Sequence, residues 1–439
     1  RFLPDALHAL AKELEAAGSK LILRRGVPQK EILGLAKSVG AQALYFNRDY
    51  SPYALRRDRA VEAAATKHRV QCHTFKDLLL VEPDECVKDD GSPYTVFTPY
   101  SRRWRVRLSD ARVRTPRPPP LPVRLLAGIA SQPIPADPAE LGFPLAANVS
   151  VEPGTPRQAG RRLTTFLGSG LLRYGSARDF PSQPGTSQLS PHLKFGTISV
   201  RTVLHGCSEA LGTELWSLDP QRPGRSLTVE QARHLSEGGT FLNELAWREF
   251  YYAILFHFPR VLTEPFRTGF QGFRWPTEDR TLFQRWVDGR TGFPIVDAGM
   301  RQLAQTGWMH NRLRMVVAMF LTKTLLVDWR WGEKVFLERL TDGDAAANNG
   351  GWQWSASTGT DAAPYFRIFN PLAQSTKFDP EGEFLRRWLP ELRDLKAPLI
   401  HEPSREPLFL TQTGYPQPCV DYATQRKRAL EILAPVARS

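Results

Sequence analysis

The first 75 residues alternate amphipathic segments with short apolar runs. Residues 4–18, 28–40 and 53–69 carry apolar positions at helical spacing, while 20–26, 43–47 and 70–75 are short runs typical of strands. Strands that alternate with helices predict a parallel α/β domain. Because the first crossover of such a domain needs a strand before its helix, we expect a segment on the N-terminal side of Arg1 to be missing.

The remainder of the chain changes character twice. Between residues 106 and 160 it is rich in proline, which continues neither a helix nor an interior strand. Beyond that stretch, apolar positions recur at helical spacing in 241–258, 295–307, 313–326, 332–340 and 424–433. We therefore predict an α/β domain over residues 1–105, a Pro-rich interdomain linker over 106–160 and an all-α domain over 161–439.

Composition narrows the class of protein without naming a partner. The 58 Lys and Arg exceed the 45 Asp and Glu, which gives a formal net charge of +13. This charge predicts attraction to a polyanion, either nucleic acid or an anionic membrane surface, or it serves only solubility. No run approaches the ~18 apolar residues of a membrane span, so we expect a soluble protein. Four scattered cysteines without a C-x-x-C pair suggest neither a disulfide framework nor a metal site, and favour the cytoplasm.

Several common catalytic motifs are absent from the sequence. It has no G-x-G-x-x-G after a strand, no G-x-x-x-x-G-K-[ST] and no H-E-x-x-H, which disfavours a standard dinucleotide fold, P-loop hydrolysis and zinc proteolysis. The stretch GTSQLSPHLKFG instead sets Thr186, Ser187 and Ser190 before a helical run. These hydroxyls and the free N–H groups of the helix start suit a pyrophosphate, or they form an ordinary N-cap.

A helix face in the second half carries unusual side chains. Glu244, Trp247, Arg248 and Tyr251 fall at i, i+3, i+4 and i+7 of FLNELAWREFYY, so all four share one side of the helix. A Glu and an Arg four residues apart usually form a solvated ion pair. The neighbouring tryptophan favours the wall of a cavity.

A second helix, in GWMHNRLRM, offers an amide, a cation and a thioether. Asn311, Arg314 and Met315 share one side of it, and Arg312 points elsewhere. A methionine at this spacing is more often core packing than a ligand contact.

The stretch DGDAAANNGGWQWSASTGTDAAPYF at 342–366 combines carboxylates, amides, glycines and tryptophans. In it, Asp342 is expected to pair with Arg314, while Asp344 and Asn348 suit the donor and acceptor edges of a heterocycle. The alternative is a hydrogen-bonded loop between helices.

Taken together, these strings resemble the photolyase/cryptochrome family, most closely its microbial class I cyclobutane pyrimidine dimer photolyases. GTSQLS, NELAWREFY, GFPIVDAGMRQL, TGWMHNRLRM, DGDAAANNGGWQW and FRIFNP occur in the order of the family. The likeness covers nearly the whole chain and is strongest over 240–403. It implies a Rossmann-like antenna domain, an all-α FAD-binding domain, and a monomer that repairs pyrimidine dimers in DNA by light-driven electron transfer from reduced FAD.

The resemblance also implies roles for individual residues. Asp344 would meet the flavin ring or ribityl chain, Asn348 would face flavin N5, and the Arg314–Asp342 pair would brace the site. The remaining FAD contacts would be Tyr174, Thr186, Ser187, Gln188, Leu189 and Ser190. Electrons that reduce oxidised flavin would pass along Trp352, Trp329 and Trp275.

The same resemblance places the DNA lesion and its flanking phosphates. A flipped-out dimer would lie against Glu244, Trp247, Tyr251, Asn311, Met315 and Trp354, with Glu244, Asn348 and Met315 closest to the chemistry. Flipping by photolyases is itself a known example of base extrusion. The phosphates would be held by Arg178, Arg248, Arg312, Gln374 and Lys377.

Alternatives remain within and outside the family. The strand and W-F-R-x-D-L-R-like motif with which the family normally opens are absent before Arg1, and Ser51 stands where folate-using members carry Glu, which resembles deazaflavin-type members. Deazaflavin, folate, flavin and no antenna all stay open. Asn348, at a position where plant cryptochromes have Asp, favours repair over a cryptochrome photoreceptor. The pocket motifs of cryptochrome-DASH proteins differ from WMHNRLRM. The (6-4) photolyases usually have paired histidines where this chain has His310 and Asn311. A flavoprotein oxidase outside the family is a remote option.

Overall fold

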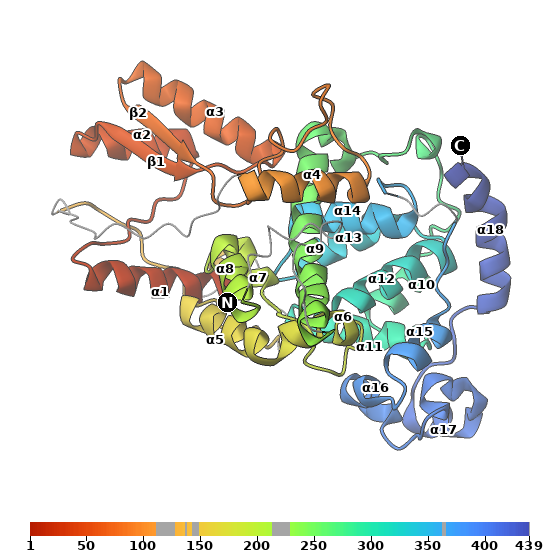
Figure 1. Cartoon of the computed structure of the whole chain (residues 1–439). Helices are drawn as coiled ribbons and strands as arrows, with labels where there is room; N and C mark the ends of the chain where they lie inside the picture. Colours follow the sequence, from red (N-terminus) through yellow and green to blue (C-terminus); the bar gives the residue numbers. More distant parts are fainter. Residues whose placement is uncertain (111–127, 137, 143–148, 213–228, 362–365, 439) are drawn as a thin grey trace.

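The computed structural model describes residues 1–110, 128–136, 138–142, 149–212, 229–361 and 366–438. A small α/β part lies at one end of the molecule, and a larger helical part makes up the rest (Figure 1). This arrangement confirms the predicted fold class.

The α/β part contains a two-stranded parallel sheet, as the alternating pattern predicts. Strands β1 (Ala43–Asn47) and β2 (Gln71–Phe75) pair in register from Ala43 opposite Gln71 to Asn47 opposite Phe75. Helix α3 (Pro52–Lys67) connects the strands and packs beside α2 (Pro28–Val39), while α1 (Phe2–Ala16) precedes them. Leu33, Ala65 and Val70 form the small core under this sheet.

The strand predicted at residues 20–26 does not form. The N–H of Leu23 donates to Ser131 Oγ at 2.9 Å, and the carbonyl of Leu23 accepts from the N–H of Gln132 at 3.0 Å. Within the described residues the segment has no strand neighbour with which to build a ladder. An apolar β-prone run is insufficient without such a partner, because a strand is defined by its pairing.

The connection between the two parts begins with a helix. Helix α4 (Phe97–Asp110) runs past residue 105, so residues 106–110 are helical, and α5 begins at Pro156. The prolines between 111 and 127 lie outside the described residues. The bounds of the two domains and of the linker therefore stay a prediction.

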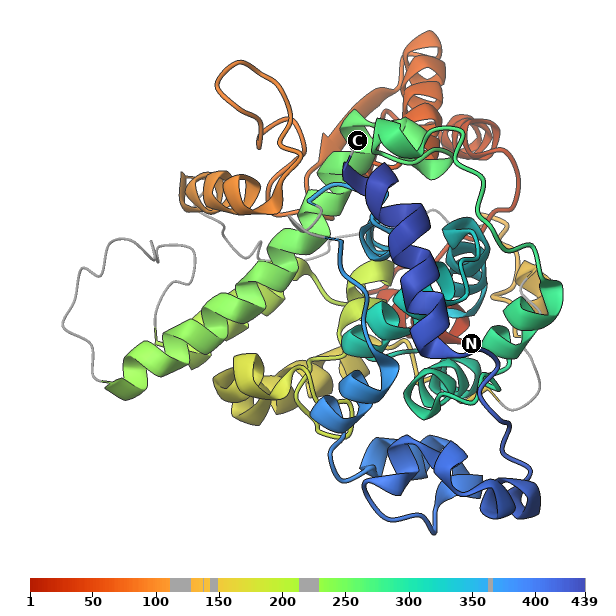
Figure 2. The same ribbon diagram turned by 90° about the vertical axis from the view of Figure 1, so that its right-hand side faces the viewer.

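The second half is helical, as predicted, and is organised around the long helix α9 (Val229–His257), which crosses the molecule in both views (Figures 1 and 2). Helix α14 packs between α9 and α13, and α18 closes the side opposite the sheet. The helices are α5 (Pro156–Thr165), α6 (Tyr174–Ala177), α7 (Ser190–Phe195), α8 (Val200–Ala210), α10 (Arg280–Val287), α11 (Pro294–Thr306), α12 (Asn311–Met319), α13 (Trp329–Arg339), α14 (Ala345–Ala356), α15 (Pro371–Phe378), α16 (Glu383–Trp388), α17 (Pro407–Thr413) and α18 (Tyr422–Arg438).

A buried carboxylate joins the two parts. Glu249, in the C-terminal half of α9, accepts from the N–H groups of Leu80 at 2.5 Å and Val81 at 3.0 Å and from the indole N–H of Trp104 at 2.6 Å. Its side chain is 1% exposed. Because a carboxylate only accepts hydrogen bonds, three converging donors suit it, and the contact fixes residues 80–81 and helix α4 against α9.

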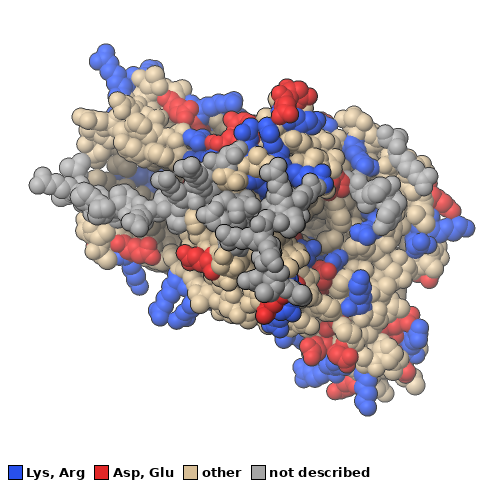
Figure 3. Space-filling view, in the orientation of Figure 1, with Lys and Arg blue, Asp and Glu red and all other residues tan. Residues whose placement is uncertain are grey.

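In Figure 3 basic and acidic side chains are interspersed over the side of the molecule that faces the viewer. In the described part of the chain, no helix has the length and apolar character to span a bilayer.

Candidate functional site

A cavity of about 630 Å³ opens among α6, α7, α9, α12 and α14. This volume lies in the range of small-molecule and cofactor pockets. Most residues proposed from the sequence meet in its wall: Tyr174, Arg178, Ser187, Ser190, Glu244, Trp247, Arg248, Tyr251, Asn311, Arg314, Met315, Asp342, Asp344, Asn348, Trp352 and Trp354. Tyr174 and Trp354, 180 positions apart in sequence, thus line one site.

The α9 wall carries Glu244, Trp247, Arg248 and Tyr251, as the i, i+3, i+4, i+7 spacing predicts. Glu244 does not pair with Arg248. It forms an ion pair with Arg178 of the neighbouring segment, and the Arg248 guanidinium donates to the carbonyl of Leu78 at 2.9 Å. Burial raises the pKa of Glu244, and the attraction of Arg178 offsets part of that rise.

The aromatic part of this wall extends into the N-terminal part. The ring of Phe97, at the start of α4, stacks on Trp247 with centroids 3.7 Å apart and planes 7° from parallel. The Phe97 N–H also donates to Asp361 in the cavity wall at 3.1 Å. The contact fixes the Trp247 indole as a flat side of the cavity.

Two carboxylates on the α14 side are paired with cations. Arg314 contacts both oxygens of Asp342 at 3.1 and 2.8 Å, which confirms the pairing expected from the sequence. Asp344 accepts from Lys194 at 2.9 Å and from the Tyr252 hydroxyl at 2.5 Å.

Asp344 is also the N-cap of α14, because its other oxygen accepts from the N–H groups of Ala346 and Ala347. Burial alone would raise its pKa, but Lys194, Tyr252 and these N–H groups outweigh burial and lower it. The carboxylate is therefore ionised at neutral pH.

Helix α14 presents Asn348, Gly351 and Trp352 to the cavity. The Asn348 Nδ2 donates to the carbonyl of Glu333 at 3.0 Å. A Cβ on Gly351 would meet no atom within 4 Å, whereas one on Gly350 would lie 2.0 Å from the Tyr251 ring. The glycine pair thus admits Tyr251 on one side and leaves open space on the other. The loop alternative for this stretch is wrong over residues 345–356.

The hydroxyl-rich turn before α7 differs from an ordinary N-cap. Leu189 is the cap residue and makes no side-chain capping bond, while Ser187 and Ser190 line the cavity. Gln188 adopts φ +50°, a left-handed conformation uncommon for a residue with a side chain. Thr186, Gln188 and Leu189 are outside the cavity lining, and Leu189 belongs to the core.

The residues present suit a flavin nucleotide. Hydroxyls at the α7 end, two paired carboxylates and aromatic walls supply polar and stacking contacts in one enclosure, as cofactor sites require. The Trp352 indole N–H is buried without a hydrogen-bond partner among the described residues, so it is a donor that a bound group would satisfy.

The sequence reasoning did not single out two charged members of the wall, Lys194 and Asp361. Lys194 lies four residues after Ser190 and follows the same face of α7, a spacing that contained the necessary signal. Asp361 has no comparable signal, because its place depends on Phe97, 264 residues away.

The three tryptophans proposed for electron transfer are buried in one core, with exposed fractions of 2% for Trp352, 1% for Trp329 and 8% for Trp275. Trp352 lines the cavity and the other two lie outside its lining. Their role stays a prediction.

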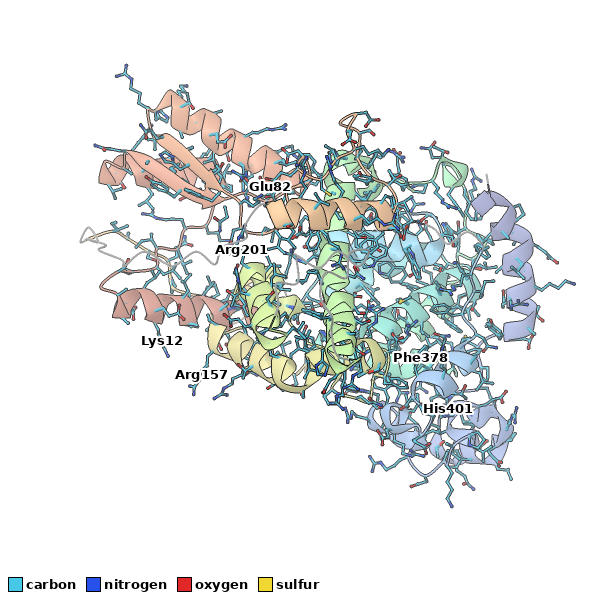
Figure 4. The ribbon with its side chains drawn as sticks, viewed as in Figure 1. Lys12, Glu82, Arg157, Arg201, Phe378 and His401 are labelled. Atoms are coloured by element: carbon cyan, nitrogen blue, oxygen red, sulfur yellow. The ribbon has the colours of Figure 1, made fainter. Side chains whose placement is uncertain are left out.

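Three of the five proposed phosphate contacts gather in a second hollow of about 590 Å³, here called the basic depression, lined by Asp179, Arg312, Phe366, Arg367, Ile368, Phe369, Asn370, Gln374, Lys377, Phe378, Arg426 and Leu430. Arg312 pairs with Asp179 at 2.7 Å and lies over the ring of Phe378, the last residue of α15, which is labelled in Figure 4. Arg178 and Arg248 lie in the cavity instead. Asp179 and Arg312 directly follow the cavity residues Arg178 and Asn311, so the two hollows are neighbours.

Comparison with known proteins identifies the family. Residues 241–434 match the FAD binding domain of DNA photolyase, and residues 1–122 match DNA photolyase. A deoxyribodipyrimidine photo-lyase of Synechococcus is 40% identical over 97% of this chain and 85% of the relative, and one of Halobacterium salinarum is 40% identical over 98% and 86%. The chain belongs to the DNA photolyase family, an FAD-binding family of lyases, which confirms the predicted family, enzyme class and cofactor.

Solved structures extend this comparison. A bacterial class III photolyase of Agrobacterium tumefaciens has a TM-score of 0.82 and 36% sequence identity. The match covers 100% of this chain and 88% of that protein. A cryptochrome of Synechocystis has a TM-score of 0.80 and 27% sequence identity, and the match covers 98% of this chain and 87% of that protein. An archaeal photolyase of Sulfolobus tokodaii, solved with two FAD molecules, has a TM-score of 0.77 at 30% identity, with coverages of 98% and 87%. Photolyases and a cryptochrome thus share this fold.

Proposed function

We propose that this protein repairs cyclobutane pyrimidine dimers in DNA, using light absorbed by bound reduced FAD. The observation that carries the proposal is the cavity whose wall contains most of the expected flavin contacts together with the expected dimer contacts. The relatives named deoxyribodipyrimidine photo-lyase support the same substrate. Reduced FAD, when bound and excited, supplies one electron to the dimer and recovers it after the ring opens, so no net redox change occurs.

The residues of the chain divide the remaining work between them. Ser187, Ser190 and the Lys194–Asp344 pair would hold the polar part of the cofactor, and Asn348 would face its ring. On the lesion side, Trp247 and Trp354 supply flat apolar contact to the flipped bases, and Met315 adapts to their shape. Enclosure excludes water from the reacting bases and strengthens every polar contact to them.

Glu244 is the group we assign to the carbonyl edge of the dimer. Its ion pair with Arg178 keeps it in place before the lesion enters. Burial raises its pKa, which favours uptake of a proton when negative charge develops beside it, so that the carboxyl can then donate a hydrogen bond. Negative charge that develops on the dimer is stabilised by such a donor.

DNA reaches the cavity across the basic depression. Arg312, Gln374 and Lys377 line it together with Arg367 and Arg426, and phosphate contacts of this kind give affinity that falls with salt. A dimer is already poorly paired, so its extrusion costs a few kcal/mol or less.

The test is repair of an oligonucleotide that contains one thymine dimer, by the reduced protein under blue light, measured as recovery of thymine ultraviolet absorbance. Matched substrates carry a (6-4) lesion, or the same dimer in a single strand. Glu244→Ala should lower repair per absorbed photon, while Glu230→Ala, at the exposed start of α9, should leave it unchanged. Flavin photochemistry without repair of any substrate would favour the cryptochrome alternative.

A further inference from the structure

Lys323 is a buried lysine that the proposed repair mechanism does not use. It lies in the π-helical turn Phe320–Thr324 and is 1% exposed. Its amine donates to Ser357 Oγ at 2.8 Å and to the carbonyl of Arg367 at 2.7 Å, and it lies 4.6 Å from the centre of the Phe366 ring. No carboxylate pairs with it among the described residues.

The two acceptors belong to two functional elements. Ser357 ends α14, the helix that carries Asn348 and Trp354 in the cavity wall. Arg367 belongs to the 366–369 segment, which lines the basic depression. Lys323 therefore connects the C-terminal end of the cavity helix α14 with the 366–369 segment that lines the basic depression.

The surroundings of this amine accommodate both of its protonation states. Two acceptors match the two hydrogens of a neutral amine, and the third hydrogen of an ammonium meets the electron-rich face of the Phe366 ring. Burial in the first place, and the like charge of Arg367 in the second, lower the pKa of Lys323 to about 7. The protonation of the Lys323 amine therefore changes readily when a new anion binds nearby.

We propose that Lys323 is a positioning residue for DNA: its amine holds the 366–369 segment that lines the basic depression, and it takes up a proton when DNA phosphates occupy the depression. The inference rests on the proposed binding of DNA at this surface. Phosphates favour the ammonium, so by linkage the protonated form of the protein binds DNA more tightly.

The sign of the pH dependence follows from this linkage. DNA raises the pKa of Lys323, so the extra affinity is complete below the pKa of the free protein and is lost as pH rises through the pKa of the complex. Arg367 is the charged group that acts on Lys323, and no other described side chain of α12, α13, α14 or α18 shifts its pKa. Near the depression, His310 has a pKa lowered to about 4 by burial and stays neutral above pH 7.

The experiment measures binding of a labelled duplex with one thymine dimer to the flavin-loaded protein in the dark, between pH 7 and 9 at constant salt. The wild type should weaken by about fivefold across this range, which corresponds to a rise of about one unit in the pKa on binding from a starting value of about 7. Titration calorimetry in two buffers of different ionisation enthalpy should show net proton uptake.

Substitutions separate charge from position. Lys323→Met should bind more weakly at pH 7 and lose the pH dependence, and Lys323→Arg should restore affinity at pH 7 while remaining independent of pH. Ser357→Gly, which suits the φ of +65° and removes one acceptor, tests the same contact if Lys323→Met fails to fold. It should weaken binding at pH 7. The matched control Lys377→Met should weaken binding equally at every pH and reduce the salt dependence by about one phosphate contact.

Three outcomes would contradict either the role of Lys323 or the proposed function. Tight binding of the damaged duplex without pH dependence or proton uptake would overturn the role of Lys323 and leave the proposed repair function intact. Equal, weak binding of damaged and undamaged duplexes at every pH would contradict the proposed function itself. Persistence of the wild-type pH dependence in a folded Lys323→Met protein would also refute the inference.

Discussion

Replacing Glu249 tests whether three hydrogen-bond donors in the interior need a charged acceptor. In Glu249→Gln, the amide oxygen can take the place of the oxygen that accepts from Val81 and Trp104, and the new NH₂ group then faces the Leu80 N–H, donor against donor. The hydrogen bond from Leu80 is lost, and the bonds from Val81 and Trp104 are made to a neutral acceptor instead of a charged one. Relief from burying a charge offsets part of this loss.

The net loss expected for Glu249→Gln is therefore about 2 kcal/mol. Glu249→Ala leaves three buried donors without an acceptor, at about 1–3 kcal/mol each, so it should cost about 4 kcal/mol or more. Glu230→Gln is the matched control on the same helix, because the Glu230 side chain is 74% exposed, and it should change stability by less than about 0.5 kcal/mol.

The assay is urea unfolding followed by circular dichroism and by tryptophan fluorescence. Both Glu249 variants should unfold at lower urea, in the order Ala before Gln, and limited proteolysis should cut them sooner near residues 80–104, which the carboxylate holds. A Glu249→Gln protein as stable as the wild type would refute the argument that these donors require an acceptor of full charge.

Other substitutions probe the surroundings of the cavity. Gly332→Ala would place a Cβ 2.1 Å from the Trp352 ring, so we expect a loss of about 1–3 kcal/mol and weaker flavin retention in gel filtration; full retention would show that the indole moves freely. Burial raises the pKa of Glu333 from 4.5 to about 7. Between these two pH values the folded protein therefore holds a proton that the unfolded chain has released. The free energy of unfolding should fall by about 1–3 kcal/mol as the pH rises from 4.5 to 7. Glu333→Gln should flatten that profile in thermal melts, and an unchanged slope would assign it to another group. Trp275→Phe should slow photoreduction of oxidised flavin, measured by absorbance, while repair by pre-reduced protein is spared; normal photoreduction would remove Trp275 from the pathway.

Local pattern was sufficient for the helices and for which side of each helix forms the site. Glu244 and Tyr251 share the α9 face, and Arg314 and Met315 share the α12 face, because a period of 3.6 residues fixes these directions whatever the surroundings. Resemblance of the motifs to photolyases supplied the family and the cofactor. The pairing of Arg314 with Asp342 followed from the complementary charges of two neighbouring motifs.

Tertiary structure decided what depends on partners distant in sequence. Glu244 pairs with Arg178 rather than with Arg248, the run at 20–26 forms no strand, and Phe97 completes an aromatic wall from another part of the chain. In the sequence, Lys323 has no feature that distinguishes it from other residues of an apolar helix. Only the folded structure shows that its amine is buried against residues 357 and 367. Periodicity determines the direction of a side chain from its own helix, whereas burial, pKa and ion pairing depend on which other segments pack there.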